Sequence, residues 1–155
     1  MIIGNVSAGA DASVWRLVSI RGDMEQIIIG KQSNIQDNSV LHSNQGSDFH
    51  APASLTIGNQ VIIGHACVIH GDTIGNLGLI GINPRILDHA VIQPHALIGA
   101  NSLGPPGEIL ERRYLWLGLP VRKIHALTQQ ESAFFEYSAD NYVQFKKLYQ
   151  EYNNA

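Results

Sequence analysis

The chain has 155 residues, a formal net charge of −3 and 15% charged residues, against about a quarter in typical soluble proteins. It contains no cluster of Lys and Arg and no apolar run of about 18 residues, which argues against a nucleic-acid partner and against a membrane span. The length suits one domain. So little charge leaves apolar surface that self-association would cover.

Aliphatic residues, nearly all of them branched, recur at every sixth position along most of the chain. A period of six fits neither a helix nor simple strand alternation. It predicts an all-β solenoid in which three short sides make one coil, which is a parallel β-helix. These residues, called anchors below, are Ala8, Val14 and Ile20; Ile29, Ile35 and Leu41; Ile57, Ile63 and Ile69; and Ile74, Ile80, Ile86, Ile92 and Ile98.

Small residues occupy the fourth position after nearly every anchor, and we expect them to point inward near the next corner. Glycine directly after an anchor, as at Gly30 and Gly64, is expected to form a tight turn because it has no Cβ to clash there. The small positions are Ala12, Val18, Ser33, Ser39, Val61, Cys67, Thr73, Gly78, Pro84, Ala90, Ala96 and Ser102.

Cys67 is the only cysteine, and its place in this pattern predicts a buried thiol. No disulfide can form within the chain, which fits a reducing compartment. The N-terminus does not read as a signal peptide. We therefore expect a cytoplasmic protein.

The hexad pattern predicts a β-helix over residues 1–103, interrupted by an inserted loop near 43–53. A turn-rich stretch then opens a connecting segment, 104–126. Thr128-Gln-Gln-Glu131 is a capping box, and an amphipathic helix is expected over 127–152. The apolar residues expected to pack this helix on the β-helix are Phe134, Phe135, Tyr142, Phe145, Leu148 and Tyr149.

With the insertions removed, the anchors fall on three sides of a prism. The residues that directly follow three anchors of one side are Arg21, His42 and His70. Adjacent coils of a β-stack lie about 4.8 Å apart, so we expect His42 and His70 to be neighbours on the outer surface, with Arg21 beside His42. Two close imidazoles are half of a plausible zinc site. The alternative is that each is an ordinary exposed corner histidine.

A third ligand must come from elsewhere. His65 lies at a different corner, so it would reach the pair only across the interface of a three-fold oligomer, which is an ordinary symmetry for homo-oligomers. Asp37 falls in the same column as His65, one coil earlier, and Gln36 precedes it. These polar side chains would orient Arg21 across the interface or hold the metal-bound water.

Two further polar groups are candidates for a role. Arg21 and Asp23, in the sequence Arg-Gly-Asp, are expected to form an ion pair between subunits. His50, in the inserted loop, is a possible mobile proton carrier because histidine titrates near neutral pH. Plain loop surface is the alternative for His50.

Several short motifs together resemble the γ-class carbonic anhydrase family, and more narrowly the short bacterial γ-carbonic-anhydrase-like hexapeptide-repeat proteins of the YrdA/PaaY type. The resemblance runs from near residue 2 to about residue 150. The ordered motifs are Arg21-Gly22-Asp23, Asn34-Ile35-Gln36-Asp37, Leu41-His42, Gly64-His65 and Ile69-His70-Gly71.

This resemblance implies a left-handed parallel β-helix, a homotrimer, and Zn²⁺, or another divalent metal such as Fe²⁺ or Co²⁺, at each subunit interface. His42 and His70 would come from one subunit and His65 from the next. The implied reaction is the lyase reaction of carbonic anhydrase, in which zinc-bound hydroxide attacks CO2 to give bicarbonate. Gln36 would hydrogen-bond that hydroxide, and Tyr137 or Asn141, from the helix, would reach towards the pocket.

The sequence also departs from the family pattern. Met24 stands where the archetypal enzyme has a glutamate, and Asp48 is the only acidic residue of the inserted loop. The alternatives are a hexapeptide-repeat acyltransferase or thioesterase, or a catalytically silent trimer that keeps the metal to hold its subunits together.

Overall fold

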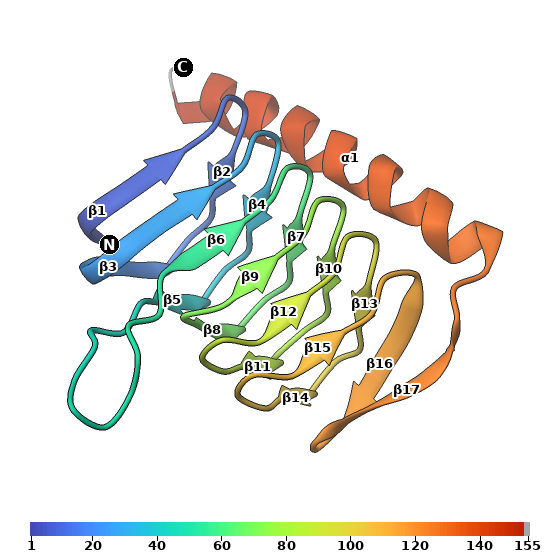
Figure 1. The fold of residues 1–155 in the computed structure, drawn as a ribbon. Coiled ribbons are helices and arrows are strands. Elements are labelled where there is room, and N and C mark those ends of the chain that lie inside the picture. Colours follow the sequence, from blue (N-terminus) through green and yellow to red (C-terminus); the bar gives the residue numbers. More distant parts are fainter. Residues whose placement is uncertain (154–155) are drawn as a thin grey trace.

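The structure, a computed structural model, describes residues 1–153 as a left-handed parallel β-helix of about six coils with one helix along it (Figure 1). This confirms the fold class expected from the hexad period. One ten-stranded sheet wraps two sides of the prism, because β3 continues around a corner. A seven-stranded sheet forms the remaining side.

The three sides are named by their anchors. Side one holds the end of β1 (Ile2–Ala8), the end of β3 (Ser19–Ile29), β6 (Leu55–Ile57), β9 (Thr73–Ile74), β12 (Val91–Ile92) and β15 (Ile109–Leu110). Side two holds β2 (Ser13–Val14), β4 (Asn34–Ile35), β7 (Ile62–Ile63), β10 (Leu79–Ile80), β13 (Leu97–Ile98), β16 (Tyr114–Gly118) and β17 (Val121–Ala126). Side three holds the starts of β1 and β3, then β5 (Val40–His42), β8 (Val68–His70), β11 (Arg85–Ile86) and β14 (Leu103–Gly104).

The register of the sides is the one that the anchors predict. Ile35 pairs with Ile63 and Ile63 with Ile80 on side two, while Leu41 pairs with Ile69 on side three. These anchors are 0% exposed and form one continuous apolar core. Each coil therefore buries its anchors against the coils above and below, as a stacked repeat requires.

Corner geometry differs from the expected glycine turns. The left-handed backbone conformation falls three residues after an anchor, mostly on non-glycine residues such as Asn38 and Asn101, whose φ values are 63° and 55°. Gly64 is needed for a different reason: a Cβ there would lie 2.3 Å from the carbonyl oxygen of Gly81. The glycines after anchors thus allow close stacking of coils.

The β-helix continues beyond Leu103, where the sequence predicted a connecting segment. Gly104, Leu110 and Trp116 continue the six-residue step, and they pair with Ile86, Ile92 and Ile98 of the preceding coil. The repeat is not apparent in this part of the sequence because Gly104 and Trp116 occupy anchor positions in place of aliphatic residues. An antiparallel hairpin of β16 and β17 closes this end.

Helix α1 (Gln129–Asn153) begins at the predicted capping box, where Thr128 and Glu131 exchange backbone and side-chain hydrogen bonds. It crosses the outside of side two, contacting β2 and β7, and is the only helix of the described chain (Figure 1). It is not long and apolar enough to cross a membrane.

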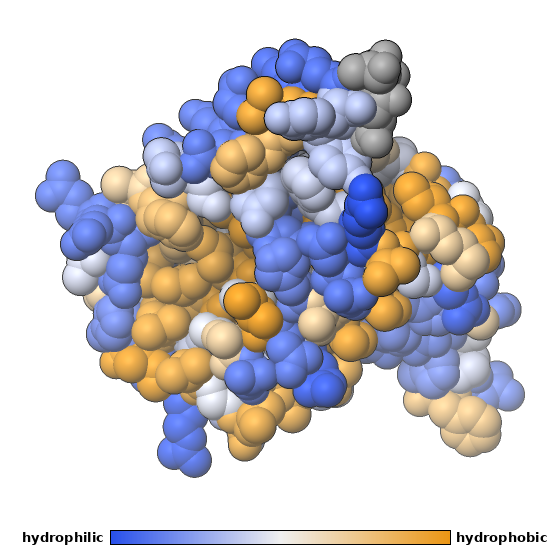
Figure 2. All heavy atoms as spheres, turned by 180° about the vertical axis from the view of Figure 1, so that it is seen from behind, coloured by the Kyte–Doolittle hydropathy of each residue, from blue (hydrophilic) through white to orange (hydrophobic). Residues whose placement is uncertain are grey.

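The packing face of α1 differs from the expected one. The residues buried beneath the helix are Phe135, Ser138, Ala139 and Val143. Of the expected residues, Phe135 is buried and Tyr142 lies edge-on against Trp15 of the prism, with ring centroids 5.6 Å apart. Phe134, Phe145 and Leu148 are instead 52%, 50% and 51% exposed, so the expectation that they are buried on the prism is not met. Figure 2 shows further apolar surface below the helix, on the face turned away in Figure 1.

Replacing Ile80 by Ala tests the inward register. Ile80 is 0% exposed, so we expect the free energy of unfolding to fall by about 2–5 kcal/mol, the cost of deleting a buried aliphatic side chain. Ile109→Ala is the control, because Ile109 is 56% exposed and should change stability by less than about 0.5 kcal/mol. Urea unfolding at one protein concentration measures both, and equal losses would mean that the register is wrong.

Candidate functional site

Arg21, His42 and His70 lie in register on three neighbouring strands of side three. Arg21 pairs with His42 in the ladder of β3 and β5, and His42 pairs with His70 in the ladder of β5 and β8. Each residue follows a buried anchor, so alternation along the strand turns its side chain outward. The column expected from the hexads is therefore present at the corner between sides three and one, called the third corner below.

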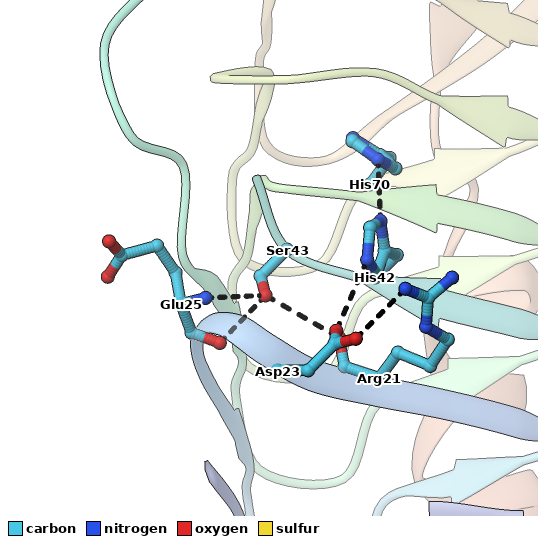
Figure 3. A network of polar contacts seen from close by, with 6 residues as sticks. All are labelled: Arg21, Asp23, Glu25, His42, Ser43 and His70. Atoms are coloured by element: carbon cyan, nitrogen blue, oxygen red, sulfur yellow. Dashed lines mark hydrogen bonds and ion pairs between the residues drawn. The ribbon is translucent and has the colours of Figure 1, made fainter. Parts of the chain in front are cut away.

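The two imidazoles are close enough to share a ligand. Nδ1 of His42 lies 3.0 Å from Nε2 of His70, and the ring centroids are 5.0 Å apart (Figure 3). Two nitrogens bound to one tetrahedral zinc at 2.0–2.1 Å lie about 3.3 Å from each other. The spacing in this chain is near that value, so the pair fits two ligands of such an ion.

His70 is held from behind by a carboxylate that sequence reasoning missed. Nδ1 of His70 contacts Oδ1 of Asp88, whose Oδ2 accepts a hydrogen bond from Nδ2 of Asn44 at 3.0 Å. Partial burial acts to raise the pKa of Asp88, but the hydrogen bonds from His70 and Asn44 outweigh it and hold the pKa below its usual value. The sequence did contain a signal for this contact: Asp88 lies two positions after Ile86, which is an anchor of side three like Leu41 and Ile69.

His42 is kept neutral by its surroundings. Its pKa is lowered first by burial and then by the nearby His70 and Arg21, against a smaller opposite effect of Asp23. Its Nε2 is buried and lies 3.4 Å from Oδ1 of Asp23, yet in the described chain it has no hydrogen-bond partner of good geometry. With the ring proton on Nε2, facing Asp23, the lone pair of the neutral ring lies on Nδ1, the atom that faces His70. A neutral imidazole is the form that a divalent metal binds.

Arg21 and Asp23 form an ion pair of 2.9 Å within this one chain. The hydrogen bond from Arg21 is the largest cause that lowers the pKa of Asp23. Figure 3 shows Asp23 between Arg21 and His42, so its two oxygens serve both neighbours. The expected pairing between subunits stays a prediction.

The remaining candidates lie elsewhere on the prism. Nδ1 of His65 is 3.2 Å from Oδ2 of Asp37, at the corner between sides two and three, called the second corner below. Gln36 is 6% exposed, and its Nε2 donates to Oδ1 of Asn34 at 3.1 Å. Tyr137, on α1, is 63% exposed. Within residues 1–153, no three His, Cys, Asp or Glu side chains of the single chain converge as a metal site.

The inserted loop belongs to the third corner. Backbone hydrogen bonds of 2.9 and 2.8 Å between Asn44 and Ala53 close its base. Asp48 and His50 are exposed at its tip. Below it, the side chain of Glu25 points away from the imidazoles in Figure 3, and its backbone is bound by the Ser43 hydroxyl. The loop thus stands beside the histidine pair.

A shortened corner places a carboxyl group in the core. The step from Ile69 to Ile74 is five residues, so Asp72 takes the inward position that Ala90 has one coil later, and Thr73, expected inward, is exposed. Asp72 is 2% exposed, and neither carboxyl oxygen has a hydrogen-bond partner in the described chain. Burial, assisted by Asp88, raises its pKa well above the usual value. Cys67, by contrast, is a buried thiol as expected.

No family model matches the chain. Individual proteins do, and those reported below include two that are named as carbonic anhydrases. The chain is 43% identical to Protein YrdA of Escherichia coli, covering 99% of this chain and 84% of that protein. It is 38% identical to a probable carbonic anhydrase of Methanocaldococcus jannaschii, covering 98% and 92%. It is 31% identical to the mitochondrial gamma carbonic anhydrase 2 of Arabidopsis thaliana, covering 99% and 55%.

A solved structure of similar fold is a putative acetyltransferase of Bacillus cereus. It superposes with a TM-score of 0.90 at 33% identity, covering 97% of this chain and 84% of that one. The backbone arrangement of the prism and helix is therefore shared with proteins that carry different activity names.

Replacing Asp72 by Ala should stabilise the metal-free protein, because an unpaired buried polar group costs about 1–3 kcal/mol. The pKa of Asp72 is higher in the folded than in the unfolded chain, so the cost of burying this carboxyl group is smallest at low pH and grows as pH rises. The gain in unfolding free energy should therefore be larger at about pH 8 than at about pH 4. Chelator-treated protein is unfolded with urea, with Asp48→Ala as the exposed control. A destabilised Asp72→Ala would show that the carboxyl has a partner.

Proposed function

Because the chain belongs to the γ-carbonic-anhydrase-like family of hexapeptide-repeat proteins, we propose that it is a metal-dependent enzyme that converts CO2 and water to bicarbonate. The observation that carries this proposal is the 3.0 Å contact between His42 and His70. A carboxylate stands beside each ring, Asp23 for His42 and Asp88 for His70. Zinc is the expected ion, with ferrous iron or cobalt as alternatives.

The site is proposed to be completed by oligomerisation. One chain offers two imidazoles at its third corner and a separate one at its second corner, where Asp37 orients His65. In a three-fold ring of parallel prisms, His65 of the partner subunit would join His42 and His70. The exposed apolar residues of α1 and of the prism support such an association, because water-exposed apolar area favours burial.

The residues of the chain would divide the work as follows. A divalent ion held by three imidazoles supplies a Lewis acid that makes a hydroxide nucleophile available at neutral pH. Gln36 is fixed through its Nε2 by Asn34, so its Oε1 is the atom that would accept a hydrogen bond from the attacking hydroxyl group. Asp23 holds the guanidinium of Arg21 in place. Arg21 and Asp37 would then help to align the two subunits at their interface.

Each hydration cycle must also release a proton to solvent. The loop at the third corner carries His50 and Asp48, both exposed. Histidine is the side chain whose unperturbed pKa suits proton transfer near neutral pH. We therefore assign proton export to this loop. Tyr137, on helix α1, is a separate candidate for contact with the substrate.

Stopped-flow hydration of CO2 tests the activity. Zinc-loaded protein should hydrate CO2 well above the buffer rate, and His70→Ala should return it to that rate because an ion with two remaining imidazoles is poorly held. His125→Ala is the control, because His125 is exposed on β17. Full metal occupancy without hydration would instead support a silent metal-binding trimer.

Mixing two inactive variants tests the shared site. His42→Ala and His65→Ala should each lose metal as pure trimers. In randomly mixed trimers, about a quarter of the interfaces would combine an intact His42 with an intact His65 of the partner subunit, so about a quarter of the metal sites should return. Metal content of the refolded mixture measures this. No recovery in trimers shown to be mixed would exclude a ligand set shared between subunits.

A second candidate is acyl transfer or thioester hydrolysis, favoured by the likeness to a putative acetyltransferase. In that chemistry His70, paired with Asp88, would act as a general base rather than as a ligand. Acetyl-CoA should then raise the thermal midpoint of metal-free protein, and thiol release should be lost in His70→Ala. Neither effect is expected of the carbonic anhydrase.

A further inference from the structure

We propose that Asp88 is the positioning residue for His70, and that Asn44 acts through Asp88 to tie this metal ligand to the inserted loop. The inference rests on the proposed function in taking His70 as a ligand. It adds a residue that neither the repeat pattern nor the motif resemblance pointed to. Its basis is a chain of contacts that crosses three coils at the third corner.

The contacts of Asp88 leave it little freedom. One carboxyl oxygen contacts Nδ1 of His70, and the other accepts from Nδ2 of Asn44 at 3.0 Å. The side chains of Asp88 and His70 are 28% and 29% exposed, so neither is a freely moving surface group. A carboxylate used at both oxygens can rotate only by breaking one of the two bonds.

This arrangement determines which nitrogen of His70 can bind a metal. A carboxylate accepts hydrogen bonds, so the contact with Asp88 places the ring proton on Nδ1. The lone pair is then on Nε2, which is the atom that lies 3.0 Å from His42. Carboxylate partners of this kind fix the tautomer and orientation of metal-binding histidines, and their loss typically weakens metal binding about 10–100-fold.

Asn44 connects the same contact to the loop. Asn44 lies at the base of the inserted loop, where it forms a β-bridge with Ala53 through two backbone hydrogen bonds. Its side chain reaches Asp88 rather than the solvent. The position of the loop base is thereby coupled to the orientation of His70 through Asp88.

Zinc affinity of the full-length protein, measured by competition with a chromogenic chelator, tests the role of Asp88. Asp88→Ala should weaken binding about 10–100-fold, and Asp88→Asn by less, because the amide oxygen still accepts a hydrogen bond. Asp11→Asn is the control: Asp11 is also an ion-paired carboxylate, but its partner is Lys146. A loss in Asp88→Ala equal to that of His70→Ala would make Asp88 a ligand itself and overturn the positioning role.

Cobalt-substituted protein separates positioning from plain stability. The visible cobalt bands of Asp88→Ala should shift while the number of bound ions at saturation stays the same. If Asp88 only supports the fold, the thermal midpoint will fall but zinc affinity and the cobalt bands will match the wild type, and the proposal is wrong.

A double-mutant cycle tests the route through Asn44. Asn44→Ala alone should weaken zinc binding by a smaller factor than Asp88→Ala, and adding it to Asp88→Ala should cause no further loss. Independent, multiplying effects would show that Asn44 does not act through Asp88.

A readout on metal-free protein separates this inference from the proposed function. Nitrogen NMR shifts of the His70 ring should report a proton on Nδ1 in the wild type and a mixture of tautomers in Asp88→Ala. If the wild type binds no metal but shows this difference, the proposed function fails and the positioning holds. If the tautomer is unchanged by Asp88→Ala, the positioning fails whatever the protein binds.

Discussion

Burial of one aliphatic anchor in every six residues is the constraint on which the rest of this structure depends. An anchor such as Leu41 or Ile69 can be removed from water only by stacking on the anchors of the neighbouring coils. Stacking fixes the ladder register, and the register fixes every outward side chain relative to the coil above. His42 therefore lies over His70 because Leu41 lies over Ile69.

Electrostatic order at the third corner follows from this stacking. Arg21, Asp23, His42, His70 and Asp88 form a continuous series in which a carboxylate stands on the outer side of each of the two imidazoles and Arg21 holds the first carboxylate. Burial first, and then the neighbouring ring and the arginine, lower the pKa of His42, while Asp88 holds the far side of His70. The result is two imidazoles whose nitrogens face each other at nearly the spacing that two ligands of one ion require.

The same prism keeps the third imidazole away from this pair. His65 and Asp37 follow anchors of side two, so the geometry that stacks His42 on His70 also separates His65 from both. Exposed apolar residues on α1, among them Phe145 and Leu148, lie on a chain with few charges. The proposed trimer would explain both features. It would bring the two parts of the site together, and it would cover apolar surface that is exposed in the single chain.

The sequence by itself determined the fold class, the three sides, the inserted loop and the stacking of His42 on His70, because a period of six and its interruptions are properties of the chain. It also determined where the helix starts, through the capping box at Thr128 and Glu131. Only the tertiary structure decided the rest. Asp88 meets His70 from the next coil, and although its spacing from Ile86 places it near the third corner, the contact itself depends on how the chain turns there. Asp72 is buried because the ladder of Ile74 with Ile92 keeps its register after a step of only five residues. The coils continue through Trp116 because a large ring fills an anchor site, and Phe134 stays exposed because the helix turns Phe135 inward. These outcomes depend on packing between neighbouring coils and between the helix and the prism. Such packing involves residues that are far apart in the sequence, so no local pattern predicts it.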